Sequence, residues 1–356
     1  MRSVASKPLV SVVIPSYNHS TFVGEAIESL LISSVEDWEA VIVDDGSTDG
    51  SVELIEQMKD PRIRLYSQPN RGAHNAINRG VYLAKAPWIA VLNSDDRFHH
   101  SKLERHLEIH EKNPQYEASA SLVRYVSEKG TPIAEDSYLA WNYRRMKSTY
   151  EDRDSLFASL IAGNHLITSS SLFIKKTVFQ EIGGFVPLRY NHDWFMFLTL
   201  ALRRRFLVLE EDLCDYRRHP ANTIAEDQDA GRVEANFVLE WHLFKNFELG
   251  DPVLDPQQAS LAVATNPGVC YGLLLLFQAW RQVNRNDLRK STSLFERFDH
   301  PVRQFALRIL REERPFLDIR RFLKRAMGLE RAMRLADCAL RAYRLMTDAF
   351  PRALKP

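Results

Sequence analysis

Acidic residues occur in pairs at two points of the sequence where a short apolar run ends. Asp44 and Asp45 follow the run 40–43, and Asp95 and Asp96 follow the run 89–92. Adjacent carboxylates repel each other unless hydrogen bonds or a cation compensate their charge. Oxygen ligands of this kind suit Mg²⁺ or Mn²⁺, which leave positions open for phosphate oxygens. The two pairs therefore predict a divalent cation and a nucleoside diphosphate.

The two common phosphate-binding motifs are missing from the sequence. No Gly-x-Gly-x-x-Gly follows the first apolar run, and there is no Gly-x-x-x-x-Gly-Lys-Ser/Thr loop. Phosphate must then be held by the metal and by basic side chains. Taken alone, the stretch 44–49 also fits a turn followed by a helix N-cap, because Asp, Gly, Ser and Thr favour both.

The elements that would bring the acidic pairs together alternate between β-branched runs and amphipathic helical stretches. Predicted strands are 10–14, 40–43, 63–66 and 89–92, and predicted helices are 22–32, 51–58, 73–83 and 102–111. This alternation predicts an α/β fold with a mostly parallel twisted sheet flanked by helices. Such sheets bind ligands beyond the carboxyl ends of their strands, where the polar stretches 15–18, 44–49, 68–72 and 93–96 lie.

A second region, 116–224, mixes predicted strands at 119–126, 166–174 and 206–209 with helices near 156–161 and 193–203. Beyond residue 225 the β signal ends and the pattern is helical. We place a boundary in the polar stretch 225–232, between a domain of residues 1–225, with halves 8–115 and 116–225, and a helical C-terminal region, 226–356.

Composition excludes several classes of protein. Apolar residues make up 45% and charged residues 26%, a globular mixture, and the net charge of +1 predicts no binding to nucleic acid. Three distant cysteines indicate a reducing compartment. The longest apolar run, 269–277, is too short to cross a bilayer. We therefore expect a cytoplasmic protein.

Four ordered motifs resemble the inverting family-2 glycosyltransferases with the GT-A fold. They are Val-Val-Ile-Pro-Ser-Tyr-Asn at 12–18, Val-Ile-Val-Asp-Asp-Gly-Ser-Thr-Asp at 41–49, Asn-Arg-Gly-Ala-His-Asn-Ala-Ile-Asn-Arg-Gly at 70–80 and Val-Leu-Asn-Ser-Asp-Asp at 91–96. The resemblance covers about 8–224. It implies that residues 1–225 are a catalytic domain with a nucleotide-binding half and an acceptor half. The implied reaction moves a sugar from a nucleotide-diphosphate donor, most simply a UDP-sugar, to a saccharide or lipid-linked hydroxyl in cell-surface polysaccharide or glycolipid assembly.

The resemblance also implies roles for individual residues. The implied donor-binding residues are Pro15, Ser16, Tyr17, Asp44, Asp45, Asn70, Gly72, Asp95, Arg217 and Arg218. Tyr17 would lie near the base, and Asp45 would accept a hydrogen bond from it. Asp95, Asp96 and His219 are the implied ligands of Mn²⁺ or Mg²⁺. Since Asn93 stands where the family often has an acid, the resemblance leaves open which of Asp95 and Asp96 contacts the metal.

A later pair of motifs implies the catalytic base. Ile-Gly-Gly-Phe at 182–185 and Asn-His-Asp-Trp-Phe at 191–195 resemble the family's Gly-Gly-Phe segment and its acidic motif, so Asp193 is the implied base. His192 stands where the family more often has an acid. From position alone, Asp193 also fits the first turn of a helix, stabilised by the helix dipole.

Two other functions stay open on the residues alone. A nucleotide-sugar-binding module without catalysis would fit the departures at Asn93 and His192. A nucleotidyltransferase would share the sheet and the cation, but the stretch 15–18 lacks the Gly-rich basic loop that we expect of one.

The C-terminal segment differs in charge from the rest of the chain. Residues 301–356 hold 14 Lys and Arg against 6 Asp and Glu, with apolar positions at helical spacing. This pattern fits a helix on an anionic membrane surface, which would make the protein peripheral on the inner face of the cell membrane. It also fits an apolar stripe that packs on the catalytic domain while the arginines are solvated.

Overall fold

The computed structural model describes residues 7–133 and 156–223 and single positions between 226 and 253. The chain divides into two compact units, Met1–Glu226 and Asp227–Pro356. Most of the helical region expected from residue 226 onward, and all of the basic segment 301–356, lie outside the described residues. The described positions between 230 and 245 are helical. Within the described ranges, no helix has the length and apolar character needed to cross a membrane.

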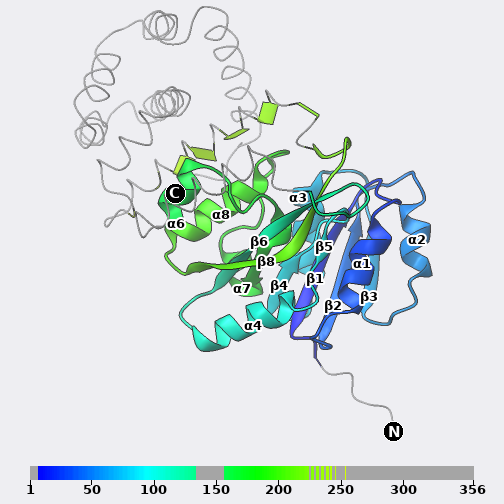
Figure 1. Cartoon of the computed structure of the whole chain (residues 1–356), viewed down its shortest axis with the longest axis horizontal. Helices are drawn as coiled ribbons and strands as arrows, with labels where there is room; N and C mark the ends of the chain where they lie inside the picture. Colours follow the sequence, from blue (N-terminus) through cyan, green and yellow to red (C-terminus); the bar gives the residue numbers. More distant parts are fainter. Residues whose placement is uncertain are drawn as a thin grey trace, which may run out of the picture. The chain divides into compact units, whose positions relative to one another are not determined.

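The first unit is built on one eight-stranded sheet with the order β3-β2-β1-β4-β7-β6-β8-β5 (Figure 1). Its strands are β1 Val10–Ser16, β2 Trp38–Asp44, β3 Ile63–Ser67, β4 Trp88–Val91, β5 Arg97–Phe98, β6 Ala118–Ser127, β7 Leu172–Lys175 and β8 Phe206–Arg218. Neighbouring strands from β3 to β4 run parallel, and β7 is antiparallel to both its neighbours. The predicted mixed α/β class is therefore confirmed.

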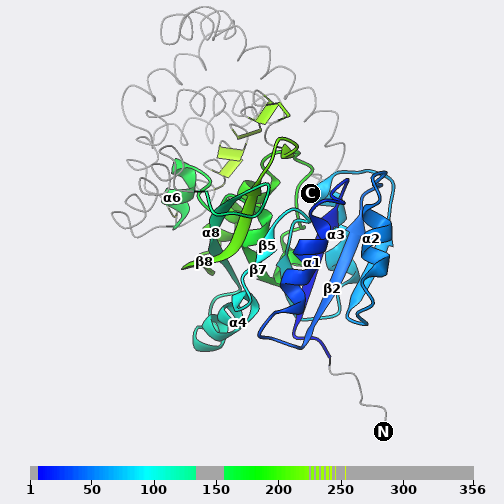
Figure 2. The same ribbon diagram turned by 45° about the vertical axis from the view of Figure 1, so that its right-hand side comes forward.

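Helices cover both faces of the parallel half (Figures 1 and 2). On one face, β1 packs with α1 Val23–Leu31, α2 Ser51–Gln57 and α4 Lys102–Lys112 in one core. On the other face lies α3 Ala73–Leu83, where a Cβ built on Gly80 would come within 2.3 Å of the Val13 side chain. Because β1 and β2 are buried along their whole length, their apolar runs are continuous, as in covered parallel sheets.

The second half of the unit departs from the prediction in one element. The stretch 166–174 was expected to be a single strand, but the structure has the 3-10 turn η1 Ser169–Ser171 first, and only then β7. The cause is local, because the Thr168 hydroxyl accepts a hydrogen bond from the Ser170 amide and Ile167 has a φ of 66°. The helices here are α6 Leu156–Ala162, α7 Lys176–Glu181 and α8 His192–Leu202.

Short elements gave no sequence signal. The two-residue strand β5 and the six-residue helix α7 are too brief to show a hydrophobic period. In contrast, β8 extends far beyond the expected 206–209, and it pairs with β6 across a β-bulge at 121–123. This extension carries the chain as far as Arg218, next to the rim described below.

The loops after β1 and β2 are tied together at the carboxyl edge of the sheet. The Asn18 amide donates to the Ser47 hydroxyl at 2.9 Å, and the Thr48 amide donates to the Asn18 side chain at 2.8 Å. The Asp45 amide donates to the Ser16 carbonyl at 2.7 Å. These bonds turn two separate loops into one rigid rim.

Candidate metal and nucleotide site

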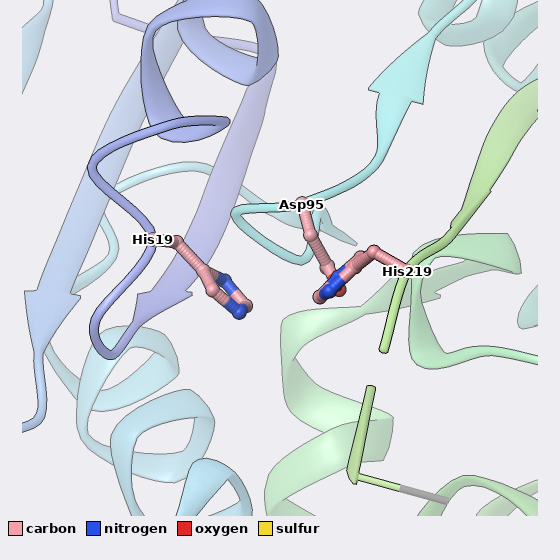
Figure 3. A group of neighbouring side chains, drawn as sticks. All are labelled: His19, Asp95 and His219. Carbon is pink, nitrogen blue, oxygen red and sulfur yellow. The ribbon is translucent and has the colours of Figure 1, made fainter. Parts of the chain in front are cut away.

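Three side chains suited to metal binding gather at the rim (Figure 3). His19 comes from the loop after β1, Asp95 from the loop between β4 and β5, and His219 directly follows β8. One ligand atom of each lies within 4.8 Å of the other two. His219 Nε2 and Asp95 Oδ2 are 3.1 Å apart. Segments distant in the sequence thus supply one compact set of ligands.

The pKa shifts of Asp95 and His19 favour cation binding. Burial acts to raise the pKa of Asp95, but the hydrogen bond from His219 and the charges of His19 and His219 outweigh it, so the pKa is lowered. Burial is the main cause that lowers the pKa of His19. A carboxylate and a neutral imidazole are the forms that bind metal ions.

Neighbouring groups hold two of the three residues in place. His19 Nδ1 lies 2.8 Å from the Ser94 hydroxyl, which leaves Nε2 as the ligand atom. Such an outer contact fixes the ring position of a metal-binding histidine. The backbone amide of His219 donates to Asn222 Oδ1 at 2.6 Å, which fixes the main chain that carries the His219 ring.

The donor set discriminates between the two expected ions. Two imidazole nitrogens and one carboxylate are a mixed nitrogen and oxygen set. Mg²⁺ prefers oxygen ligands and retains its waters, whereas first-row transition ions accept imidazole readily. The residues present therefore fit Mn²⁺ better than Mg²⁺.

The second carboxylate of the pair, Asp96, points elsewhere. It is 1% exposed and accepts hydrogen bonds from the Ser170 hydroxyl at 2.6 Å and the Arg217 amide at 3.1 Å. Burial, and then the charge of Asp95, raise the pKa of Asp96. Among the described residues, the group of possible metal ligands does not include it.

Asn93 belongs to the same web of bonds as Asp96. Its amide nitrogen donates to the Thr168 hydroxyl at 2.8 Å, and its amide oxygen accepts from the Ser169 hydroxyl at 2.8 Å. The amide nitrogen is also 3.4 Å from Asp96 Oδ2. An acid at position 93 would place a second carboxylate against Asp96, so the neutral amide avoids repulsion there.

Of the two arginines expected to bind phosphate, Arg217 is fully buried in the protein. Its Nε donates to the Asp95 carbonyl at 2.9 Å, its guanidinium pairs with Glu25 at 2.6 Å, and it lies over the Phe22 ring. These contacts hold Asp95 against α1. Arg218 is exposed at the end of β8.

Two buried polar atoms at the ends of β1 and β2 have no hydrogen-bond partner in the described structure. They are Ser16 Oγ and Asp44 Oδ1, on residues that stand opposite each other in the parallel register. The other oxygen of Asp44 accepts from the Gly46 and Ser47 amides. Because unpaired buried polar atoms are costly, these two mark a place where a polar ligand would bind.

Asp45 is already occupied by the loop that follows β3. Its carboxylate accepts from the Gln68 side chain at 2.7 Å, the Arg71 amide at 2.9 Å and the Gly72 amide at 2.8 Å. These bonds hold the loop containing Asn70 and Gly72 next to the rim. Pro15 is buried in β1, and Tyr17, directly after it, is 46% exposed.

Asp193 lies in the first turn of α8 and is 7% exposed. Its Oδ1 accepts from the Trp194 amide at 2.6 Å. Burial raises the pKa of Tyr216, and the charges of Asp96, Asp95 and Asp193 add to this effect. Carboxylates from both halves of the sheet thus contribute to the electrostatics of the Tyr216 phenol.

The sequence analysis missed His19. The signal was available, because His19 directly follows the polar stretch 15–18 after the first predicted strand. It was overlooked because a lone histidine in a loop has no spacing relative to another ligand. Only the fold places it beside His219, with ring centres 5.7 Å apart.

The mixed α/β sheet with candidate metal ligands at its strand ends fits the GT-A fold. Residues 11–173 match the family Glycosyl transferase family 2. This part of the chain, a little under half of its length, is thus similar to a family-2 glycosyltransferase domain.

Curated relatives agree with the family over parts of the chain. A putative teichuronic acid biosynthesis glycosyltransferase, TuaG of Bacillus subtilis, is 42% identical over 105 residues, which are 29% of this chain and 42% of that protein. Chondroitin synthase of Pasteurella multocida is 36% identical over 234 residues, 65% of this chain and 23% of that protein. The chain thus spans less than half the length of these relatives.

Solved structures share the fold at low sequence identity. TarS 1–349 of S. aureus in complex with UDP-GlcNAc has a TM-score of 0.55 and 14% identity, covering 97% of this chain and 93% of that one. The mannosyltransferase PcManGT of Pyrobaculum calidifontis, in complex with GDP-Man and Mn²⁺, has a TM-score of 0.51 and 15% identity, covering 94% and 87%. At this identity the likeness concerns the fold alone.

Proposed function

We propose that this chain is an inverting glycosyltransferase. It moves a sugar from a nucleoside-diphosphate donor, a UDP-sugar, to the hydroxyl of a saccharide or lipid-linked acceptor. The reaction would serve the assembly of a cell-surface polysaccharide or glycolipid. The observation that carries the proposal is the placement of His19, Asp95 and His219 on the same rim as the ends of β1 and β2. Solved neighbours that bind UDP-GlcNAc or GDP-Man support a nucleotide-sugar donor. The names of the teichuronic acid and chondroitin relatives support assembly of a polysaccharide.

The nucleoside of the donor would bind at the ends of β1 and β2. Asp44 Oδ1 is a buried acceptor without a partner, so it suits an N–H group of a nucleobase such as uracil. We assign this contact to Asp44, since the Asp45 carboxylate already accepts three hydrogen bonds from the Gln68–Gly72 loop. Tyr17, half exposed beside them, offers its ring for stacking on the base.

The diphosphate would lie against the ligand set. A Mn²⁺ ion held by His19, Asp95 and His219 would neutralise the negative charge that grows on the leaving diphosphate. Ser94 holds the His19 imidazole, Asn222 holds the His219 backbone, and Arg217 donates to the Asp95 carbonyl. Arg218 is the exposed arginine available to phosphate oxygens.

Asp193 would act on the acceptor. Its carboxylate takes the proton of the attacking hydroxyl while the bond to the anomeric carbon forms. The hydroxyl attacks the face opposite the diphosphate, so the configuration at that carbon inverts. Asp193 and Asp95 both add to the raised pKa of Tyr216, so the charges of the two carboxylates act on one side chain.

Replacing Asp44 by Asn should weaken donor binding. The amide can still accept from the Gly46 and Ser47 amides, but it then presents an N–H group toward the nucleoside instead of an acceptor. We expect UDP affinity in the presence of Mn²⁺ to fall by about 10- to 100-fold, which corresponds to the cost of an unmatched buried polar pair. Calorimetric titration of UDP measures this effect. Asp60→Asn, a change at an ion pair with Arg62, is the control and should leave the affinity unaltered.

The reaction type is tested by the product that is released. With Mn²⁺, a UDP-sugar and a panel of saccharide acceptors, we expect free UDP and a glycosylated product of inverted configuration. UDP with Mn²⁺ should also raise the melting temperature, because a ligand at 100 times its Kd adds about 2.7 kcal/mol to the free energy of unfolding. Release of pyrophosphate would indicate a nucleotidyltransferase. Donor binding without any turnover would indicate a binding module. A GDP-mannose arm, run in parallel, distinguishes the two bases.

A further inference from the structure

The side chain of Asn78, in the middle of α3, holds the segment that leads to Asp193. Its amide nitrogen donates to the Phe185 carbonyl at 2.9 Å, and its amide oxygen accepts from the Phe185 amide at 2.9 Å. One side chain therefore satisfies both backbone polar groups of a residue 107 positions away. Phe185 itself is 3% exposed, so neither group has water as a ready substitute.

The adjacent glycine makes this clamp possible. Gly184 has a φ of 74°, in the left-handed region, and a Cβ built on it would lie 2.6 Å from Asn78 Oδ1. Only glycine allows both the backbone conformation and the close approach of the amide. The Gly-Gly-Phe segment is thus shaped to receive Asn78.

Helix α3, which carries Asn78, is held in place by contacts with β1 and with the loop after β2. The Gly72 amide, just before α3, donates to the Asp45 carboxylate. The helix therefore begins directly after the loop 68–72, which we call the donor loop because the sequence resemblance places it at the nucleotide. Gly80, two residues after Asn78, lies so close to Val13 of β1 that the helix and the strand cannot slide past each other. Asn78 is therefore a rigid point of the donor half.

The clamped segment reaches Asp193 within eight residues. The Phe185 ring contacts His192 with ring centres 5.4 Å apart in an edge-to-face arrangement. His192 is the first residue of α8, and Asp193 is the second. His74, one turn before Asn78 on α3, is near enough to His192 to contribute to the lowering of its pKa, which burial mainly causes. The contact made by Asn78 and the electrostatic influence of His74 both link α3 to the segment 185–192.

We infer that Asn78 is a positioning residue, which sets the place of the Asp193 carboxylate relative to the donor by clamping Phe185 to the helix that follows the donor loop. The inference rests on the proposed role of Asp193. A displacement of about 1 Å in a reacting group can cost 100-fold in rate. Loss of the clamp should therefore lower turnover while the donor site keeps its own contacts.

The test compares Asn78→Ala with Asn78→Asp, Asp193→Asn and the Asn78→Ala/Asp193→Asn double variant in the full chain. We expect kcat to fall about 10- to 100-fold in Asn78→Ala, with the affinity for UDP and Mn²⁺ within twofold of the parent. In the Asp193→Asn background, the same substitution should have no further effect on kcat, because the group that it positions is already missing. Asn113→Ala, which removes a side-chain bond to the Ile109 carbonyl in α4, is the matched control and should retain full activity.

Each outcome has one meaning. The inference is wrong if Asn78→Ala keeps parental kcat, or if its effect multiplies fully with that of Asp193→Asn, as a general structural role would produce. Unchanged turnover in Asp193→Asn alone would instead refute the proposed base. If Asn78→Ala does not fold, Asn78→Asp serves, because it has the same shape and still accepts from the Phe185 amide but repels the Phe185 carbonyl. A parental kcat in that variant would also overturn the inference.

Discussion

Replacement of Asp193 by Asn should lower kcat by a factor of about 100 or more, because general base catalysis commonly contributes that much. The substituted amide keeps the size of the side chain and can still accept from the Trp194 amide, so α8 retains its first turn. The Trp194 indole, which donates to the Leu160 carbonyl at 2.9 Å, holds that turn against α6. What is lost is the ability to take a proton.

Single-turnover kinetics and titration of UDP with Mn²⁺ measure the effect of this substitution. Donor affinity should stay within twofold of the parent, since no donor contact is assigned to Asp193. The remote Asp60→Asn variant controls for the change of charge. Parental turnover in Asp193→Asn would show that this residue is not the base. Tyr216 and the carboxylates that raise its pKa, Asp95 and Asp96, would then be the next candidates.

Replacement of Asp95 by Asn should weaken Mn²⁺ binding by at least about 100-fold, since loss of an outer-shell partner alone costs 10- to 100-fold. Asp95 is the one carboxylate of the ligand set, and its oxygen lies 3.1 Å from His219 Nε2. An amide there offers a neutral, weaker ligand in place of a charge. His19→Asn and His219→Asn should weaken Mn²⁺ binding as well.

Titration of Mn²⁺, followed by electron paramagnetic resonance, measures the affinity without turnover. We expect Mg²⁺ to compete poorly, because two of the three ligands are imidazoles. Parental Mn²⁺ affinity in Asp95→Asn, combined with its loss in Asp96→Asn, would reverse the assignment of the two carboxylates. Parental affinity in His19→Asn would reduce the set to Asp95 and His219, two of the three ligands that the sequence resemblance implies.

The contacts of Asp45 and Arg217 differ from those that their motifs imply. Asp45 was expected to accept from the base, yet its carboxylate accepts three hydrogen bonds from the loop after β3, and Asp44 has the unpaired oxygen. Arg217 was expected to bind phosphate, yet its guanidinium is buried with Glu25 and the Asp95 carbonyl. The two residues of each identical pair have different contacts in the protein, so a motif alone does not assign their roles.

Local patterns along the chain are enough to predict the parallel half of the sheet and the place of its rim. The local signals are the continuous β-branched runs at β1, β2 and β4 and the amphipathic period of α1 and α3. A strand that is buried on both faces needs a continuous apolar run, and a helix that is buried on one face needs a periodic one. Polar residues at the strand ends then follow from the direction of the parallel strands.

Which side chains meet at the rim depends on the folded arrangement of the loops. His19 joins Asp95 and His219 from three loops, and Asn78 joins Phe185 across 107 residues. Such contacts depend on the exact turn of each loop, as at Ile167, where a φ of 66° replaces an expected strand by a 3-10 turn. The direction of a side chain at the rim results from many long-range hydrogen bonds acting together. These bonds cannot be predicted from the period or spacing of residues along the chain.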